Sequence, residues 1–318
     1  MSLTVGVDIG GTKIAAGLVD EHGQVLAQHR AVSPATQPTE IVRTIGELVR
    51  RLTDTLTGTD TTVEAVGASA AGFVDKQRAT LVFAPNLAWR DEPLRSHLEK
   101  ELGLPVVVEN DANAAAWGEF TFGAGEDIDN LLMLTLGTGV GGGIVLDGDL
   151  VRGGFGMGGE VGHITLVPGG VRCGCGRLGC LESYGSGSAL VRVTREQAAA
   201  HPRRAADLLE RAGGEAAAID GPMITSAAQE GDAFARERLA ELGDWVGQGI
   251  ATLTAVLDPN VVVIGGGVAE AGDLLLDPVR ESFAAHVTAA GHRPMLEVRK
   301  AQLENAGMVG VADLARRR

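Results

Sequence analysis

Aromatic residues are scarce in this sequence, at 3% of 318 residues, so its core must be built from aliphatic side chains. Hydrophobic residues of all kinds still reach 45%, which is enough for a globular core. Acidic residues outnumber basic ones, and the formal net charge is -14. An acidic surface repels nucleic-acid phosphates and anionic lipids, so the composition argues against nucleic-acid binding and membrane adsorption. Lysine is rare, and only Lys13 falls within a glycine motif.

Long apolar runs and paired cysteines are also missing. The best apolar stretch, at 131–146, is interrupted by glycines and is not expected to span a bilayer. The N-terminus lacks the basic and apolar regions of a signal peptide. The three cysteines all lie between positions 173 and 180, which does not fit a secreted disulfide framework. These absences predict a cytoplasmic protein.

What remains is an alternation of strand and helix patterns, which predicts an α/β fold. The chain opens with three strands joined by tight turns, and a strand, glycine turn and strand recur near the start of the second half. This echo predicts two related α/β halves with a cleft between them and a hinge near residue 110. We expect strands at 3–9, 14–19, 24–32, 63–69, 105–108, 130–136, 144–146, 261–264 and 295–298, and helical segments at 38–56, 93–102, 111–122, 188–257, 272–290 and 305–315.

The first glycine motif runs from Asp8 to Lys13 and lies between two predicted strands. Glycines at such a turn let backbone N–H groups approach a phosphate closely. Asp8, at the end of a strand, is placed to orient Mg²⁺ through water. An ordinary hairpin with a turn aspartate explains the motif equally well when it is taken alone.

Two further glycine turns follow predicted strands. Residues 137–143 hold five glycines, which is more than a hairpin needs, and this favours a second phosphate-binding turn. The turn at 265–267 suits a nucleotide base or ribose, although a tight strand-to-helix turn is nearly as good an explanation. The nucleotide-binding candidates of the three turns are Asp8, Gly10, Gly11, Thr12, Lys13, Gly137, Thr138, Gly139, Gly265, Gly266 and Gly267.

A polar triplet, Glu109-Asn110-Asp111, ends a short buried strand and opens a helix. Taken alone, Asp111 is best explained as the cap of that helix, a frequent role for aspartate. The functional alternative is a general base, because phosphoryl transfer needs an acceptor hydroxyl whose proton is taken by a positioned carboxylate. Asn110 could then bind neighbouring sugar hydroxyls.

The most specific pattern is His163 followed by Cys173, Cys175 and Cys180. Three thiolates and one imidazole form a closed tetrahedral set that suits structural Zn²⁺. Buried free thiols are a poor explanation, because the segment is polar and rich in glycine. A catalytic thiol is also a poor explanation, because nothing singles out one cysteine. The four residues are therefore predicted zinc ligands.

With Glu160-x-Gly-His163 and the Cys-x-Cys-Gly-x-x-Gly-Cys pattern, the sequence resembles the ROK family of sugar kinases along essentially its whole length. The resemblance implies an actin-like ATPase fold with two α/β domains. It implies a small domain at 1–110 completed by the C-terminal helix at 301–318, and a large domain at 111–300 carrying the zinc loop and oligomer contacts. It also implies a homodimer or homotetramer.

Carried over to this sequence, the family's site assigns Asp111 as the catalytic base for the sugar 6-hydroxyl. His163 would face zinc with one ring nitrogen and sugar with the other. The glycine turns would hold ATP. The resemblance implies sugar contacts from Asn110, Glu160, His163 and Glu182, and we expect Gly72 and Asn86 to line the pocket.

The sequence therefore predicts ATP-dependent phosphorylation of glucose to glucose 6-phosphate, with Mg²⁺ bridging the phosphates. Alternatives are a kinase for fructose, mannose or an N-acetylated amino sugar, use of polyphosphate as donor, a catalytically silent sugar-binding scaffold, and a sugar-sensing repressor. The repressor is disfavoured because the first strand begins at residue 3, leaving no room for a preceding DNA-binding helix-turn-helix, and because the net charge is acidic. The scaffold is disfavoured because Asp111 and both phosphate turns are intact.

Overall fold

The computed structural model describes residues 2–58, 60–84 and 89–318. The chain forms two compact units: Met1–Leu131 with Gly143–Gly159 and Gln302–Arg318, and Leu132–Gly142 with Glu160–Ala301. Among the helices of the described residues, none combines the length and hydropathy that a bilayer span requires. Asn86, expected at the sugar pocket, lies outside the described residues.

The first unit contains a five-stranded sheet in the order β3-β2-β1-β4-β8. β1, β2 and β3 form the predicted antiparallel meander, while β4 and β8 run parallel to β1. The carboxyl ends of β1, β4 and β8 therefore share one edge, where Asp8 pairs with Ser69 and Ser69 with Glu109. The bounds are β1 Ser2–Ile9, β2 Lys13–Val19, β3 Val25–Val32, β4 Thr62–Ala70 and β8 Val106–Asn110.

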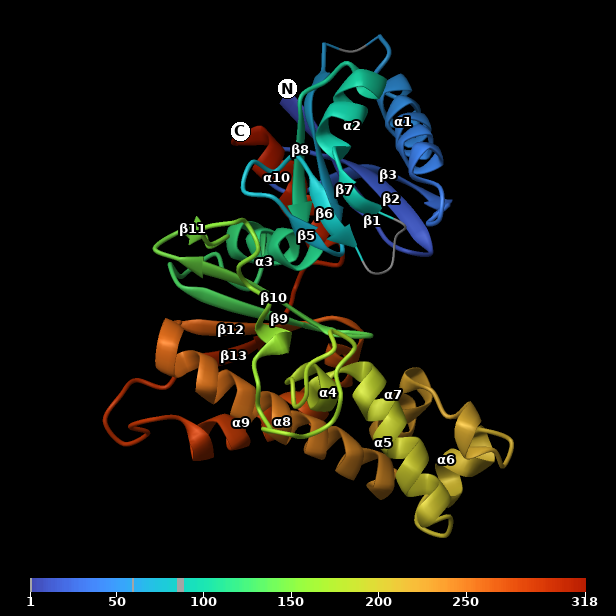
Figure 1. The fold of residues 1–318 in the computed structure, drawn as a ribbon, viewed down its shortest axis with the longest axis vertical. Coiled ribbons are helices and arrows are strands. Elements are labelled where there is room, and N and C mark those ends of the chain that lie inside the picture. The colour runs from blue at the N-terminus through green and yellow to red at the C-terminus, as the bar shows by residue number, and fades with distance from the viewer. Residues whose placement is uncertain (1, 59, 85–88) are drawn as a thin grey trace. The chain divides into compact units, whose positions relative to one another are not determined.

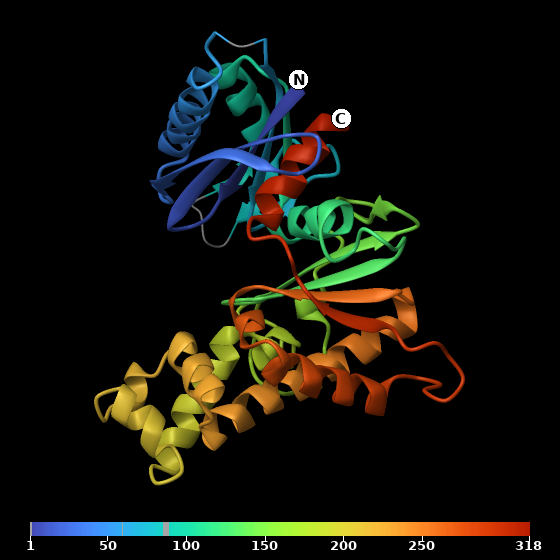
Figure 2. The ribbon, with the colours of Figure 1, turned by 180° about the vertical axis from the view of Figure 1, so that it is seen from behind.

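The two faces of this sheet are covered differently. Alternate apolar residues of β1, β4 and β8 pack with α1 (Pro38–Asp54) and α2 (Leu94–Leu102) into one aliphatic core. On the other face lies α10 (Ala306–Arg316), which packs on β1 and β4 (Figures 1 and 2). Its backbone comes so close that a Cβ at Gly67 would overlap the carbonyl of Val311.

α3 (Asp111–Phe122) also packs on α10 and so belongs to the first compact unit. The sequence suggested a boundary just before this helix, and a functional domain boundary near residue 110 stays a prediction. The start of α3 at residue 111 and its end at residue 122 agree with the expected helix.

A small antiparallel sheet of β5 (Phe73–Val74), β6 (Leu81–Ala84) and β7 (Trp89–Glu92) was not predicted from the sequence. Its strands have two to four residues, and β7 is largely polar. Such short segments carry no readable alternation. The sheet matters because the turn between β5 and β6 holds residues that contact the end of β8.

The second five-stranded sheet has the order β11-β10-β9-β12-β13. The expected glycine turn at 137–143 is wrong in its second half, because β10 begins at Val140 and Gly141 to Gly143 lie inside the strand. A Cβ at Gly143 would overlap that of Ala116, so the strand needs glycine there for close packing. β13 also lies two residues later than expected. The bounds are β9 Leu131–Leu136, β10 Val140–Leu146, β11 Asp149–Leu150, β12 Val261–Gly265 and β13 Glu297–Lys300.

Helices make up most of the second unit. The long helical segment expected at 188–257 divides into separate helices, and the longest, α8, packs on α9 (Figure 1). α9 ends at His286, four residues before the expected end. The bounds are α4 Glu182–Gly185, α5 Gly187–Ala200, α6 Ala206–Arg211, α7 Gly221–Glu230, α8 Ala233–Leu257 and α9 Asp273–His286.

Candidate active site and metal centre

Asp111 is the first residue of α3, and it is not the helix cap. The cap is Asn110, whose side-chain oxygen accepts the backbone N–H of Asn113 at 2.9 Å. Asp111 as a whole residue keeps some exposed surface, and its carboxylate accepts the N–H of Ala112 at 2.9 Å. Because Asn110 caps the helix, the simplest structural explanation for Asp111 is removed, and its carboxylate is left for another use.

Two carboxylates influence each other at this edge of the sheet. Burial, followed by the negative charge of Asp8, raises the pKa of Asp111 above its ordinary value. Burial also raises the pKa of Asp8, although Lys13 and the hydroxyl of Ser69, 3.5 Å from Asp8 Oδ1, act in the opposite direction. A carboxylate with a raised pKa is a stronger proton acceptor than a solvated one, which suits Asp111 to general-base catalysis.

Asn110 is held from both ends of its side chain. Besides capping α3, it donates from Nδ2 to the carbonyl of Gly72 at 3.1 Å. Gly72 has a φ of 152°, in the region that favours glycine. The structure thus brings together two of the expected sugar-site residues, and within the described residues the hydrogen bond to Gly72 accounts for one of the two amide hydrogens of Asn110.

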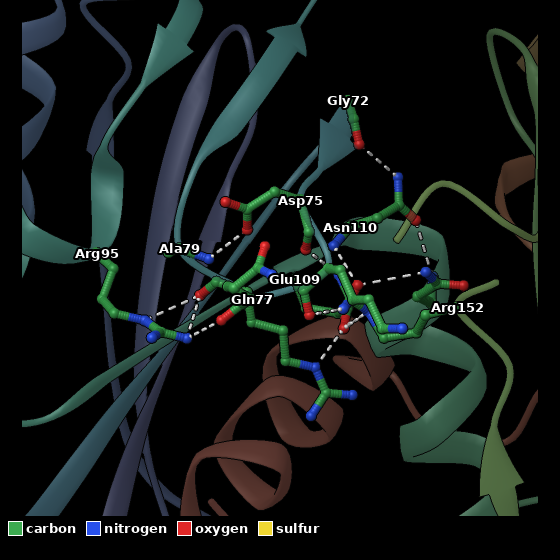
Figure 3. A network of polar contacts seen from close by, with 11 residues as sticks. Gly72, Asp75, Gln77, Ala79, Arg95, Glu109, Asn110 and Arg152 are labelled. Carbon is green, nitrogen blue, oxygen red and sulfur yellow. Dashed lines mark hydrogen bonds and ion pairs between the residues drawn. The ribbon is translucent and has the colours of Figure 1, made fainter. Parts of the chain in front are cut away.

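Beside Asn110, a fully buried carboxylate forms the centre of a polar network (Figure 3). Glu109 Oε2 accepts Arg78 Nε at 2.9 Å and lies 2.8 Å from Arg152 Nε. The second contact lacks hydrogen-bond alignment and is an ion pair only. Sequence reasoning missed both arginines, because they lie 31 residues before and 43 residues after Glu109 along the chain.

The first glycine motif forms a tight turn after β1. The N–H of Gly10 donates to the carbonyl of Lys13 at 2.9 Å, and the carbonyl of Thr12 accepts from Ser33. The side chains of Thr12 and Lys13 are exposed. Asp8 and Lys13 line a polar pocket of about 170 Å³ together with residues at the start of α10.

In the second unit, a cavity of about 990 Å³ lies beside the other two glycine turns. Gly137, Thr138 and Gly267 line it, and most of the remaining wall comes from α5 and α7, with Val268 and Glu270 beside Gly267. Its volume is in the upper part of the range for small-molecule sites, roughly 300 to 1,000 Å³. The other candidates have packing roles: Gly265 is buried beside Met133, and a Cβ at Gly266 would collide with the backbone of Leu136.

The start of α5 is fastened to the glycine turn at 137–139. Gly187 donates its N–H to the carbonyl of Gly137 at 2.7 Å, and the Ser186 side chain caps the helix. A helix N-terminus adds a favourable field for an anion, so this arrangement suits phosphate. Sequence reasoning expected helical structure at 188–257 but did not connect α5 or α7 with this cavity, because their contributions are scattered side chains without a motif.

The predicted metal ligands converge. The ligand atoms of His163, Cys173, Cys175 and Cys180 all lie within 4.8 Å of one another. Cys173 Sγ is 3.7 Å from His163 Nδ1, and Cys175 Sγ is 3.7 Å from Cys180 Sγ. A tetrahedral zinc site with Zn–S of about 2.3 Å has ligand-to-ligand edges of about 3.8 Å, so these residues fit the ion.

Glu182 lies two residues after the last cysteine and contacts the glycine turn at 137–139 and the residue that follows it. Its Oε2 accepts the N–H of Val140 at 3.1 Å, and its Oε1 lies 3.3 Å from Cys173 Sγ. A Cβ at Gly139 would overlap the Glu182 carboxylate, so a larger residue there would displace this side chain. Glu182 therefore joins the cysteine loop to the glycine turn, a contact that sequence spacing did not predict. Glu160 is exposed and precedes the short turn that carries His163.

Comparison with known proteins agrees with this architecture. The model of the ROK family matches residues 4–318. A glucokinase from Streptomyces coelicolor is 49% identical over 317 residues, which cover 99% of this chain and 98% of the relative. A glucokinase from Thermotoga maritima is 34% identical over 317 residues, covering 99% and 97%.

Among solved structures, a ROK family glucokinase from Streptomyces griseus in complex with glucose and AMPPNP has a TM-score of 0.89 and 50% identity. The match covers 99% of this chain and 100% of that one. The two mixed five-stranded sheets are therefore those of the actin-like ATPase fold that the sequence predicted. Matched over nearly its full length by the family model and by these relatives, the chain belongs to the ROK family.

Proposed function

We propose that this protein is an ATP-dependent glucokinase, which transfers the γ-phosphoryl group of ATP to the 6-hydroxyl of D-glucose and releases ADP. Sequence identity of 49% to 50% to glucokinases over nearly the whole chain supports glucose and ATP as the substrates. The observation that carries the chemistry is Asp111, a carboxylate with a raised pKa at the head of a helix that another residue caps.

In this mechanism, Asp111 orients the 6-hydroxyl and accepts its proton as the phosphoryl group is transferred. Little covalent chemistry is required of the protein in such a reaction, and most of the rate enhancement comes from positioning and charge stabilisation. Asn110 and Gly72 lie next to Asp111 and would hold neighbouring hydroxyls. We propose Glu160, His163, Glu182 and Asn86 as further sugar contacts.

ATP is proposed to occupy the cavity lined by Gly137, Thr138 and Gly267. The mostly apolar wall from α5 and α7 suits a nucleoside, and the glycine turn suits its phosphates. The turn from Gly10 to Lys13 would contact the terminal phosphates, with the exposed side chains of Thr12 and Lys13 as its available groups.

Two metal ions belong to the proposal. Mg²⁺ on the nucleotide would neutralise phosphate charge, and Asp8, whose burial disfavours its own ionised form, is the residue that would orient it. Zn²⁺ would be held by His163 Nδ1 and the three cysteine thiolates, a closed set that leaves no position for substrate. His163 Nε2 would then be available to the sugar.

The test is glucose 6-phosphate formation by the purified protein, with kcat/KM compared across glucose, fructose, mannose and N-acetylated amino sugars. We expect glucose to be preferred, and polyphosphate in place of ATP to give little product.

Replacing Asp111 by Asn should lower kcat by roughly 10²- to 10⁴-fold while glucose still binds. Asp54→Asn, an exposed aspartate at the end of α1, is the matched control and should leave kcat unchanged. Near-normal turnover by Asp111→Asn would remove it as the base.

A dimer or tetramer is proposed from the family resemblance, and the molar mass in solution measured by light scattering tests it. Two functional domains, 1–110 with 301–318 and 111–300, also remain a proposal. The packing of α10 on β1 and β4 supports the return of the C-terminal helix to the first domain.

A further inference from the structure

The buried network around Glu109 is not explained by stability alone. Its carboxylate is fully buried with two guanidinium groups at its Oε2. Removing charges from water is costly, and apolar residues of similar volume often give equal or better stability than a buried ion pair. A network of this kind therefore calls for an explanation in terms of what it holds in place.

One oxygen of Glu109 spans the first turn of α3. Oε1 accepts the N–H of Asn110 at 2.9 Å and the side-chain Nδ2 of Asn113 at 3.3 Å. Within the described residues, Asn113 Oδ1 is buried without a hydrogen-bond partner. Reversing that amide would place two acceptors face to face, so the orientation of Asn113 is determined by Glu109. Asp111 lies between the two residues that this oxygen holds.

The other oxygen is anchored to the turn between β5 and β6. Arg152 donates from Nη1 and Nη2 to the carbonyls of Lys76 and Asp75, both at 2.9 Å. The carbonyl of Arg78 accepts the N–H of Val108 at 3.1 Å and the guanidinium of Arg95. Both arginines are thus fixed by backbone contacts as well as by the carboxylate, so Glu109 cannot shift without disturbing this turn.

We propose that Glu109 is a positioning residue for the base: its carboxylate, pinned by Arg78 and Arg152, fixes the first turn of α3 and thereby the direction of Asp111. This inference rests on the proposed role of Asp111. A displacement of about 1 Å at a reacting group can reduce turnover about 100-fold. Precise placement of the first turn of α3 therefore explains why a buried network is present here.

The experiment compares Glu109→Gln with Glu119→Gln. Glutamine at position 109 keeps the shape of the Glu109 side chain but removes its negative charge, and an amide group would then face Arg78 and Arg152. We expect kcat at saturating substrates to fall roughly 10- to 100-fold, with KM for ATP unchanged. Glu119 is the matched control because it is also fully buried, at the other end of α3, where it accepts backbone N–H groups of Ala124, Gln302 and Leu303. Its variant should lose thermal stability comparably and keep its kcat.

A second variant, Asn113→Ala, tests the same inference if Glu109→Gln fails to fold. It removes one contact to Oε1 and should lower kcat about fivefold, the equivalent of one neutral hydrogen bond. Unchanged kcat in both variants, or an equal loss in Glu119→Gln, overturns the inference. A wild-type protein that does not phosphorylate glucose, or an active Asp111→Asn, overturns the proposed function instead.

Discussion

Two irregular segments of this protein are held rigid in different ways. The cysteine loop of the second unit brings four metal-ligand atoms together from residues 163–180. The turn before β6 in the first unit is held by charged side chains that reach it from β8, from α2 and from the segment after β11. The first kind of support would come from the proposed zinc ion, while the second is made by side chains of the described residues.

The difference has a consequence for how each segment fails. A metal site loses its support all at once, because a tetrahedral set with one ligand missing binds the ion far less tightly. A network of several ion pairs and backbone contacts can lose one member and retain the others. Two changes test this contrast between the cysteine loop and the ion-pair network. A third concerns Asp111, which follows Glu109 in the chain. They are given in decreasing order of expected effect.

The largest effect is expected from Cys180→Ser. The fully buried Cys180 is one of the four proposed ligands, so its loss should reduce bound zinc from about one ion per chain to a trace and destabilise the protein by about 4 kcal/mol. Metal analysis and thermal unfolding measure both effects. Leu178→Ser, an exposed change in the same loop, should retain the ion. Full zinc content in Cys180→Ser would contradict the assigned ligand set.

A smaller loss is expected from Arg152→Met. The Arg152 side chain is 10% exposed, and its removal leaves Glu109 with one guanidinium and takes one hydrogen-bond donor from each of the carbonyls of Asp75 and Lys76. Breaking a buried pair in this way should cost roughly 3 kcal/mol, measured by denaturant unfolding. Arg204→Met, which breaks an exposed pair with Glu237, should change stability little. Equal effects of the two variants would show that burial of the network has no energetic weight.

The smallest effect concerns pH and the stability of Asp111→Asn. The folded-state pKa of Asp111 is raised above 3.8, so between that value and the raised pKa the folded state binds more protons than the unfolded state. Stability is therefore lost as pH rises through the folded pKa, and the Asn variant avoids this loss. We expect its Tm to exceed that of the wild type at pH 8 and the difference to vanish below about pH 4. A variant less stable than the wild type at pH 8 would contradict this.

The same contrast explains what could be predicted from the sequence. The metal ligands are close together along the chain and of a distinctive chemical type, so their convergence followed from spacing alone. The start of α3 and the meander at 3–32 were also predicted, from local pattern. Arg78 and Arg152 could not be connected with Glu109, because no local pattern marks a contact between distant segments.

Two errors have a physical cause as well. The identity of the helix cap was wrong because Asn and Asp are equally good caps, and only the backbone geometry decides that Asn110 is the last residue before the helix. The start of β10 was wrong because glycines usually mark turns. In this strand Gly143 is needed for the close approach of α3, which is a tertiary effect.

The packing of α3 on α10 also provides a spectroscopic reporter. Trp117 on α3 is buried, donates from Nε1 to Asp313 Oδ2 of α10 at 2.9 Å, and has the Arg317 guanidinium 5.2 Å from its ring centre. In a chain with three tryptophans and one tyrosine, its emission can be isolated by replacing Trp89 and Trp245. Fluorescence from this single indole would then follow the seating of the C-terminal helix in real time, without an added label.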